Sequence, residues 1–305
     1  MPELPEVSVI VNSLNRKIKG LTLESIEYDW PKGFHWNGYS IRDLKGAKVV
    51  GVERKGKVVI INLERSSRNQ NSRKILSQTR GSTLNFSILI HLKLTGQLIY
   101  QDKKTKIAGG HPIPPLNLPV PNKTTRVTFA FANGGHLYFN DIRKFGWVKI
   151  VDSSQSTVDS AIGELGPDAL EIKYEEFRDR LKKKPNARIK KLLMDQSFVS
   201  GIGNIYSDEA LWRAKIHPAR LVSSLKSLEI RELYGGIRES LKLAIEKGGS
   251  SANSFVDSGG ERGLFLTYAR AYHMTGKPCA RCKTPIVRKK MDSRSAHFCP
   301  ACQHL

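Results

Sequence analysis

The sequence predicts an α+β protein with an N-terminal two-sheet β-sandwich flanked by helices, a helical region and a small C-terminal metal ribbon. Strand-like alternation ends near residue 151, helical periodicity follows from about 158 to 249, and all four cysteines lie within the last 27 residues. We therefore expect three domains, at residues 1–151, 152–268 and 269–305. Hydrophobic residues make up 39% of the 305 residues, which is enough to give both larger parts a core.

The first predicted element is an amphipathic helix near the N-terminus. Pro5 suits the first helical turn, and Glu6 suits the positive end of the helix dipole. Gly20 is the expected stop. One apolar stripe with helical spacing is formed by Val7, Ile10, Val11, Leu14 and Ile18. Because this stripe ties the helix to a core, we expect the N-terminal residues to be held in place.

Strand patterns fill most of residues 21–151. Residues 58–61 form a buried apolar run, and residues 126–132 and 136–139 flank an Asn-Gly-Gly hairpin turn. Two segments interrupt the strands. The polar stretch 65–84 is expected to be a disordered insertion, and 109–122, with five prolines, is expected to be an extended loop.

Helical patterns begin again after the strands. A basic run that includes Lys190 is expected on a solvated helix face. Gly201-Ile202-Gly203-Asn204 then predicts a turn and a helix starting near Asn204, which resembles a helix-turn-helix. The N–H groups at that helix start, together with the Asn204 side chain, are a candidate phosphate site. A further helix is predicted over 225–246.

The cysteines form two C-x-x-C pairs separated by sixteen residues, at Cys279, Cys282, Cys299 and Cys302. This is the spacing of a tetrathiolate zinc ribbon. The alternative is a pair of disulfides in a secreted domain, but no apolar secretory segment precedes them. Four sulfur ligands leave no open coordination position, so we expect one structural zinc ion.

The net charge of +22 and pI of about 9.9 indicate a polyanionic partner. Nucleic acid is the first expectation. A membrane surface is the second, although no apolar run approaches the roughly 18–20 residues of a spanning helix. Thiols confined to one metal site, without a targeting peptide, favour a cytoplasmic, nucleoid-associated protein.

The N-terminus also carries a candidate nucleophile. Removal of Met1 would expose Pro2 as a secondary amine, and α-amines with a pKa of about 7.7–8.0 are partly neutral near pH 7. Attack on a sugar aldehyde carbon would give an iminium, with Glu3 beside it to transfer a proton. Alternatively, Met-Pro-Glu is an ordinary helix start, and these residues alone do not decide between the two.

Three motifs together resemble the bacterial formamidopyrimidine-DNA glycosylases, a base-excision repair family that includes the endonuclease VIII enzymes. They are residues 1–7, the Gly201–Tyr206 segment and the four-cysteine ribbon. The resemblance implies a helix-two-turns-helix DNA-binding domain. It also implies a monomeric, bifunctional glycosylase and abasic-site lyase that acts on double-stranded DNA containing oxidised bases or abasic sites through β,δ-elimination.

The same resemblance implies the residues of the catalytic site. Pro2 matches the nucleophile that forms the Schiff base, Glu3 the acid/base, and Glu6 a supporting carboxylate. Lys57 and Arg294 match cations that contact the phosphates next to the lesion.

Further residues match DNA-contacting positions of the family. Asn204 corresponds to a phosphate-binding asparagine, and Tyr272 to a tyrosine close to the DNA. Arg143 and Phe145 correspond to the pair that fills the space of the flipped base. His91 and Leu94 lie in the stretch that supplies a void-filling side chain, where Leu94 replaces the usual methionine.

The resemblance favours oxidised purines, namely 8-oxoguanine and formamidopyrimidines, as the substrate. Leu4 and the glycine-rich segment 257–263, which is similar to a loop that caps the flipped base, support this choice. Two alternatives remain open. One is an endonuclease VIII-like enzyme for oxidised pyrimidines, and the other is a non-catalytic damaged-DNA-binding protein, which Pro2, Glu3 and Lys57 argue against.

Overall fold

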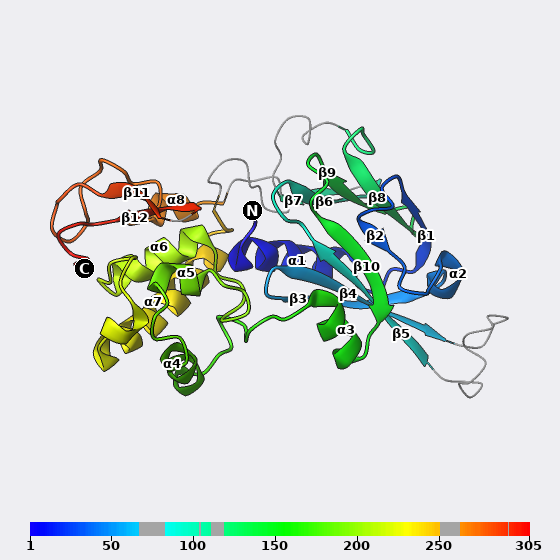
Figure 1. Ribbon diagram of the computed structural model, residues 1–305. Coiled ribbons are helices and arrows are strands. Elements are labelled where there is room, and N and C mark those ends of the chain that lie inside the picture. Colours follow the sequence, from blue (N-terminus) through cyan, green and yellow to red (C-terminus); the bar gives the residue numbers. More distant parts are fainter. Residues whose placement is uncertain (67–82, 104, 111–118, 251–262, 292) are drawn as a thin grey trace. The chain divides into compact units, whose positions relative to one another are not determined.

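The structure is a computed structural model that describes residues 1–66, 83–103, 105–110, 119–250, 263–291 and 293–305 (Figure 1). The chain divides into two compact units. Among the described residues, the first unit holds Met1–Pro2 and Glu6–Gly163, and the second holds Glu3–Pro5, 164–250 and Gly263–Leu305.

Two five-stranded sheets build the first unit (Figure 1). One sheet contains β1 (Leu23–Tyr28), β6 (Gly96–Gln101), β7 (Lys106–Gly110), β8 (Thr125–Phe131) and β9 (His136–Asp141), in the order β1-β8-β9-β6-β7. The other contains β2 (Phe34–His35), β3 (Lys48–Lys55), β4 (Val58–Ser66), β5 (Thr83–His91) and β10 (Trp147–Asp152), in the order β2-β10-β5-β4-β3. Only the short β2 pairs in parallel, with β10; the other described pairs are antiparallel.

The core of this unit includes the predicted apolar stripe of α1 (Leu4–Ile18). Val59 and Ile61 of β4 lie in the same cluster as that stripe, whereas Val58 and Ile60 lie in a second cluster with Val158 of α3 (Gln155–Ile162). Because side chains alternate along a strand, β4 is buried on both faces, which explains its continuous apolar run. A short helix, α2 (Ile41–Leu44), precedes β3.

The predicted hairpin between β8 and β9 is present, with Phe131 N–H donating to Gly135 C=O at 2.9 Å. The two predicted interruptions are wrong at their ends. Residues 65–66 and 83–84 belong to β4 and β5, where Arg65 pairs with Leu84, and residues 109–110 belong to β7. Strand pairing therefore continues into polar sequence. The remainders, 67–82 and 111–118, lie outside the described residues.

The second unit contains five helices, one 3-10 helix and a two-stranded ribbon among its described residues. They are α4 (Tyr174–Lys182), α5 (Ile189–Leu193), α6 (Asn204–Arg213), η1 (Val222–Ser224), α7 (Ser227–Glu246), α8 (Phe265–Tyr268), β11 (Val287–Met291) and β12 (Arg294–Phe298). The predicted α+β fold class, with a two-sheet sandwich, a helical region and a ribbon, is confirmed.

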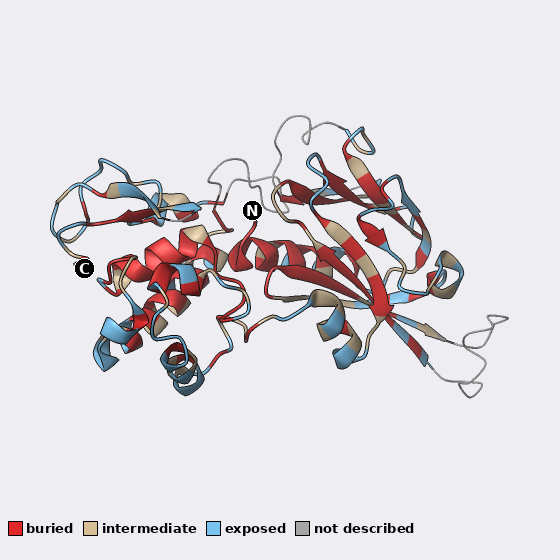
Figure 2. Cartoon of the chain, in the orientation of Figure 1, coloured by how far each residue is buried: buried red, intermediate tan, exposed pale blue. Residues whose placement is uncertain are grey.

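Helix α6 lies at the centre of the second unit, and every residue from Ile205 to Trp212 is buried (Figure 2). A helix buried on all sides must satisfy its polar side chains internally. Lys190 of α5 is also buried, so its predicted place on a solvated face is wrong. Lys190 forms an ion pair with Asp208 of α6. The spacing of residues along the sequence does not reveal this partner.

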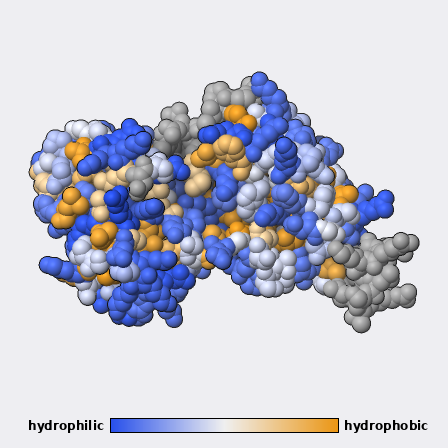
Figure 3. All heavy atoms as spheres, viewed as in Figure 1, coloured by the Kyte–Doolittle hydropathy of each residue, from blue (hydrophilic) through white to orange (hydrophobic). Residues whose placement is uncertain are grey.

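Hydrophilic side chains cover most of the face of each unit that Figure 3 shows. Within the described residues, no helix is long and apolar enough to cross a membrane. This finding is consistent with the absence of a long apolar run in the sequence.

Candidate catalytic and nucleic-acid site

Glu3 lies at the N-terminus of α6, within the second unit. Its carboxylate accepts backbone N–H groups of Gly203 at 2.8 Å, Ile205 at 3.0 Å and Tyr206 at 3.4 Å. The first turn of a helix leaves such N–H groups without intrahelical partners, and its dipole favours negative charge. Glu3 is buried, and the three donors hold its carboxylate in one position.

The two glycines of the turn make room for the N-terminal residues. A Cβ atom on Gly203 would lie 2.3 Å from Cδ of Glu3, and one on Gly201 would lie 2.4 Å from Cδ1 of Leu4. Gly201 also has φ +103°, and its C=O accepts the Leu4 N–H at 3.0 Å. Glu3 occupies the N–H groups of Gly203, Ile205 and Tyr206, so the predicted phosphate site is wrong for these three groups. The phosphate contact of the Asn204 side chain stays a prediction.

A pocket of about 460 Å³ in the second unit brings together three residues predicted from the sequence, Asn204, Tyr272 and Arg294. Burial raises the pKa of Tyr272, and a side-chain hydrogen bond with Asn204 opposes that shift. Among the described carboxylates, none forms an ion pair with Arg294. The other lining residues are His273, Thr275, Arg288, Ser293, Ser295 and His297. Among the described residues, this lining holds arginines and no acid, which suits an anion.

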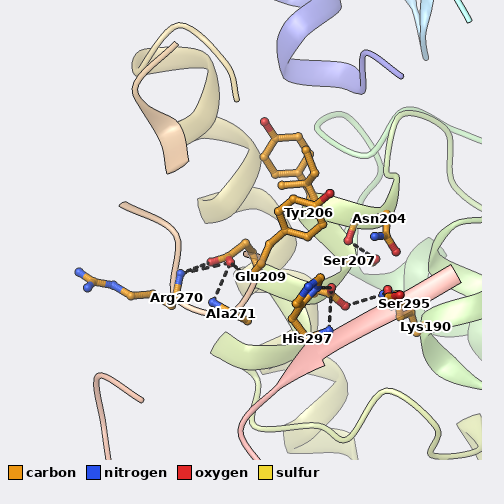
Figure 4. Close-up of polar contacts among 12 residues, drawn as sticks. Lys190, Asn204, Tyr206, Ser207, Glu209, Arg270, Ala271, Ser295 and His297 are labelled. Carbon is orange, nitrogen blue, oxygen red and sulfur yellow. Dashed lines mark hydrogen bonds and ion pairs between the residues drawn. The ribbon is translucent and has the colours of Figure 1, made fainter. Parts of the chain in front are cut away.

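Asp208 of α6 fixes one wall of this pocket through Lys190 and His297, which Figure 4 labels. Its carboxylate accepts a hydrogen bond from Lys190 Nζ at 2.6 Å and from the His297 backbone N–H at 3.0 Å. Lys190 also donates to the Ser295 C=O at 2.7 Å. Burial lowers the pKa of Lys190, and Asp208 opposes this shift. The network joins α5, α6 and β12, and so holds the strand that begins with Arg294.

Glu209 of α6 holds the segment before the ribbon in place (Figure 4). Its carboxylate accepts the backbone N–H groups of Arg270 at 3.0 Å, Ala271 at 2.9 Å and Tyr272 at 2.8 Å. Burial raises the pKa of Glu209, and these N–H groups oppose the shift. Glu209 thereby positions Tyr272 at the pocket. The sequence predictions missed both acids; the only signal was an Asp-Glu pair between the apolar residues Ile205 and Leu211 of the predicted helix.

In the first unit, Lys57 lies in the tight turn between β3 and β4 and is 5% exposed. His91, at the end of β5, has its pKa lowered to about 3, first by burial and then by the charges of Lys93 and Lys57. The Lys93 N–H donates to His91 Nδ1 at 3.0 Å, which requires an unprotonated nitrogen there. His91 is therefore neutral beside two cations.

The loop that carries Arg143 and Phe145 is fastened by the buried carboxylate of Asp141. Asp141 accepts the N–H groups of Arg143 at 3.2 Å and Gly146 at 2.8 Å, and the hydroxyl of Thr95. Thr95 follows Leu94 directly, so one carboxylate holds both predicted DNA-facing segments of this unit. Phe145 is 51% exposed, and the Arg143 guanidinium lies 4.6 Å from its ring centre.

The four cysteines meet in the ribbon region of the second unit. Their sulfur atoms lie within 4.8 Å of one another, and none is in a disulfide. Tetrahedral zinc with Zn–S bonds of about 2.3 Å would separate the sulfurs by about 3.8 Å, close to the 3.4 Å between Cys282 and Cys299. Four thiolate donors in this geometry fit zinc.

Comparison with known proteins agrees with this geometry. Residues 1–148 match the model of the formamidopyrimidine-DNA glycosylase N-terminal domain, and 165–256 match that of the H2TH domain of the same enzymes. Residues 276–305 match a zinc finger found in FPG and IleRS. The chain belongs to the formamidopyrimidine-DNA glycosylase family.

Relatives align over the whole length. A formamidopyrimidine-DNA glycosylase of Pelotomaculum thermopropionicum is 35% identical over 306 residues, covering 99% of both chains. One of Enterococcus faecalis is 34% identical over 309 residues, covering 100% of this chain and 98% of its own. The solved Lactococcus lactis protein in complex with abasic-site DNA has a TM-score of 0.80 and 30% identity, covering 99% and 100% of the two chains.

The family match and the sulfur geometry identify the cysteine cluster as the site of one structural zinc ion, as predicted. The other residues that were predicted for the catalytic site lie near the chain start. Pro2 is buried and immediately precedes Glu3, and Glu6 is buried in the first turn of α1. Of the segment 257–263, expected to cap the flipped base, residues 257–262 lie outside the described residues.

Proposed function

We propose that this protein removes oxidised purines from double-stranded DNA and then cleaves the resulting abasic site. As a member of its family, it is a DNA glycosylase of base excision repair. The alternative specificity for oxidised pyrimidines is not favoured, because the curated relatives carry the formamidopyrimidine name and solved relatives are complexes with Fapy-dG DNA.

One observation carries the proposed mechanism: the carboxylate of Glu3 is held by three backbone N–H groups directly after Pro2 in the chain. A fixed carboxylate next to a secondary amine suits the exchange of protons during sugar-ring opening and imine formation.

In this proposal, the Pro2 nitrogen attacks C1′ while the C1′–base bond breaks and the base leaves with a proton. Glu3 assists the opening of the sugar ring, which gives a cationic Schiff base between Pro2 and C1′. The iminium acidifies the C2′ proton, so its loss expels the 3′ phosphate. A second elimination expels the 5′ phosphate and leaves a one-nucleotide gap with phosphates at both ends.

Further residues position the DNA. Asn204, Tyr272 and Arg294 line one pocket, which suits a backbone phosphate next to the lesion. Lys57 and Glu6 support the reacting centre, with His91 neutral beside Lys57. Leu94, Arg143 and Phe145 occupy the space of the flipped base, because an inserted side chain offsets part of the unstacking cost.

We further propose a monomeric protein that associates with the nucleoid through its net charge of +22. It would use residues 1–151 for catalysis, 152–268 for helix-two-turns-helix binding of DNA, and 269–305 as the zinc ribbon.

Borohydride trapping on a duplex with 8-oxoguanine opposite cytosine tests this proposal, using protein whose loss of Met1 is verified by mass. An adduct that maps to Pro2 is expected, because borohydride reduces the Schiff base to a stable amine. Protein that retains Met1 is the matched control and should give no adduct. Release of the base without a trappable adduct would overturn the role of Pro2.

A further inference from the structure

Arg126 is a buried arginine near the start of β8, and its side chain lies at an irregular point of the sheet. Its neighbours on β8, Thr125 and Val127, pair with consecutive residues of β9. Arg126 is therefore the extra residue of a β-bulge. A bulge bends the strand and redirects a side chain out of the regular alternation. The sequence by itself predicts only that Arg126 begins a strand.

The Arg126 guanidinium is held by three partners. Its Nε donates to the Asp141 C=O at 2.9 Å, its Nη2 donates to the Lys123 C=O at 3.0 Å, and its Nη1 forms an ion pair with Asp29 at 3.1 Å. The planar fork of an arginine has donors in fixed directions, so three contacts define one orientation of the group. Because the residue is only 7% exposed, it suits a contact within the protein more than a contact with DNA.

Asp141, the first of these partners, is completely buried at the end of β9. Its backbone N–H donates to the Thr124 C=O at 2.9 Å, and its carboxylate accepts the Gly146 N–H at 2.8 Å. Between these two buried positions, residues 142–145 are all exposed. Asp141 therefore fixes both ends of the exposed loop that carries the predicted DNA-facing pair.

Arg126 controls the direction in which this loop leaves the sheet. The Asp141 C=O belongs to the peptide bond between Asp141 and Ile142, and a peptide unit is planar. The Nε contact at 2.9 Å therefore fixes the plane of the first peptide of the loop. A change at Arg126 releases that peptide without removing either side chain of the DNA-facing pair.

We propose that Arg126 is a positioning residue that directs the 142–145 loop and thereby places Arg143 against the base opposite the lesion. The inference deepens the proposed function of this loop and rests on it. A guanidinium only donates hydrogen bonds. Cytosine presents two adjacent acceptors on its Watson–Crick edge, whereas adenine presents one acceptor beside a donor. A correctly placed Arg143 should therefore distinguish the two opposite bases.

The test compares Arg126→Gln with Arg65→Gln in the full, zinc-loaded chain. Arg65 of β4 is the matched control, because its guanidinium also donates to a backbone C=O of the first unit, that of Asp43 in α2 at 2.7 Å. Each variant removes one positive charge and one such contact. The measurement is the dissociation constant for duplexes that carry a stable abasic-site analogue opposite cytosine or opposite adenine, which requires no chemical step.

The wild-type protein should bind the cytosine duplex about tenfold more tightly than the adenine duplex, as expected for one well-placed pair of hydrogen bonds. Arg126→Gln should reduce this preference to about twofold or less, because Arg143 is then misplaced. Arg65→Gln should retain the preference even where its melting temperature is lower. Equal affinities of the wild type for the two duplexes, or an unchanged preference in Arg126→Gln, would overturn the positioning role.

A double-mutant cycle with Arg143→Ala separates positioning from a general loss of stability. If Arg126 acts through Arg143, Arg126→Gln should not change the preference further once Arg143 is alanine. The same change in both backgrounds would contradict the proposal. A wild-type protein that shows the preference but releases no oxidised purine would count against the proposed function and leave the role of Arg126 standing.

Arg126→Lys provides a second variant where Arg126→Gln does not fold. Lysine keeps the positive charge but lacks the planar fork, so it should lower the preference about threefold. Melting temperature and zinc content verify folding. An unchanged preference in folded Arg126→Lys would show that the orientation of the guanidinium does not direct the loop.

Discussion

The Gly203 N–H donates to Oε2 of Glu3 at 2.8 Å, and a Cβ atom at position 203 would lie 2.3 Å from the Glu3 carboxyl carbon. The start of α6 thus holds Glu3, the proposed acid/base. It also requires glycine at position 203, where the backbone lies nearest to the Glu3 carboxylate. The relationship makes the glycine-rich turn part of the proposed catalytic site rather than a direct phosphate site.

Gly203→Ala should reduce base release and abasic-site cleavage about 100-fold or more, because the added methyl group displaces the Glu3 carboxylate. Single-turnover rates on both substrates measure this effect. Gly235→Ala is the control, since nothing lies within 4 Å of its Cβ position in α7 and alanine favours helix. Full activity of Gly203→Ala would exclude a fixed Glu3 as the acid/base.

Asp208→Asn should lower the free energy of unfolding of the second unit by about 3 kcal/mol, because the buried ammonium group of Lys190 loses its counter-charge. Chemical denaturation measures this change. Adding Lys190→Met to the same protein should recover part of the loss, since the uncompensated charge is removed. If the double variant is as unstable as the sum of the single variants, the ion pair is not the cause.

Stability should fall as the pH falls from 6.5 towards 3 because of His91. Its pKa is about 3 in the folded state, mainly through burial, against the ordinary histidine value of 6.5, so only the unfolded chain binds a proton between these values. The loss is at most about 1.4 kcal/mol per pH unit. Urea unfolding of wild type and His91→Gln at pH 7, 6 and 5 tests it, and parallel pH dependences would show that His91 does not contribute.

Thr95→Val should impair excision of an intact lesion more than cleavage at a pre-formed abasic site. The change removes the hydroxyl that bonds Asp141 and loosens the link between the Leu94 turn and the Arg143–Phe145 loop. We expect about tenfold slower base release, because only that step requires flipping of a stacked base. Thr95→Ser keeps the hydroxyl and serves as the control. Equal losses on both substrates would contradict this role.

Cys299→Ser should release zinc and reduce DNA affinity by about 100-fold or more, because the site loses one of its four thiolate ligands and the ribbon loses the metal that holds it folded. Zinc content and binding to the abasic-site duplex measure this. The β-sandwich of the first unit should keep its unfolding transition. Unchanged affinity after complete loss of zinc would show that the ribbon does not hold DNA.

Sequence alone determined much of this protein. The stripe from Val7 to Ile18, the β8–β9 hairpin and the cysteine spacing all depend on local periodicity or short-range chemistry, and each is present in the structure. The family, and with it the glycosylase activity, followed from motifs that keep their order along the chain.

Only the tertiary structure decided which groups satisfy one another. Glu3 reaches Gly203 across 200 positions of sequence, Lys190 is buried against Asp208, and Asp141 fastens two loops. A buried charge requires a partner, but nothing in local spacing names that partner, because the choice depends on how distant segments pack. For this reason the lysine looked solvated in the sequence, and the helix start looked open to phosphate.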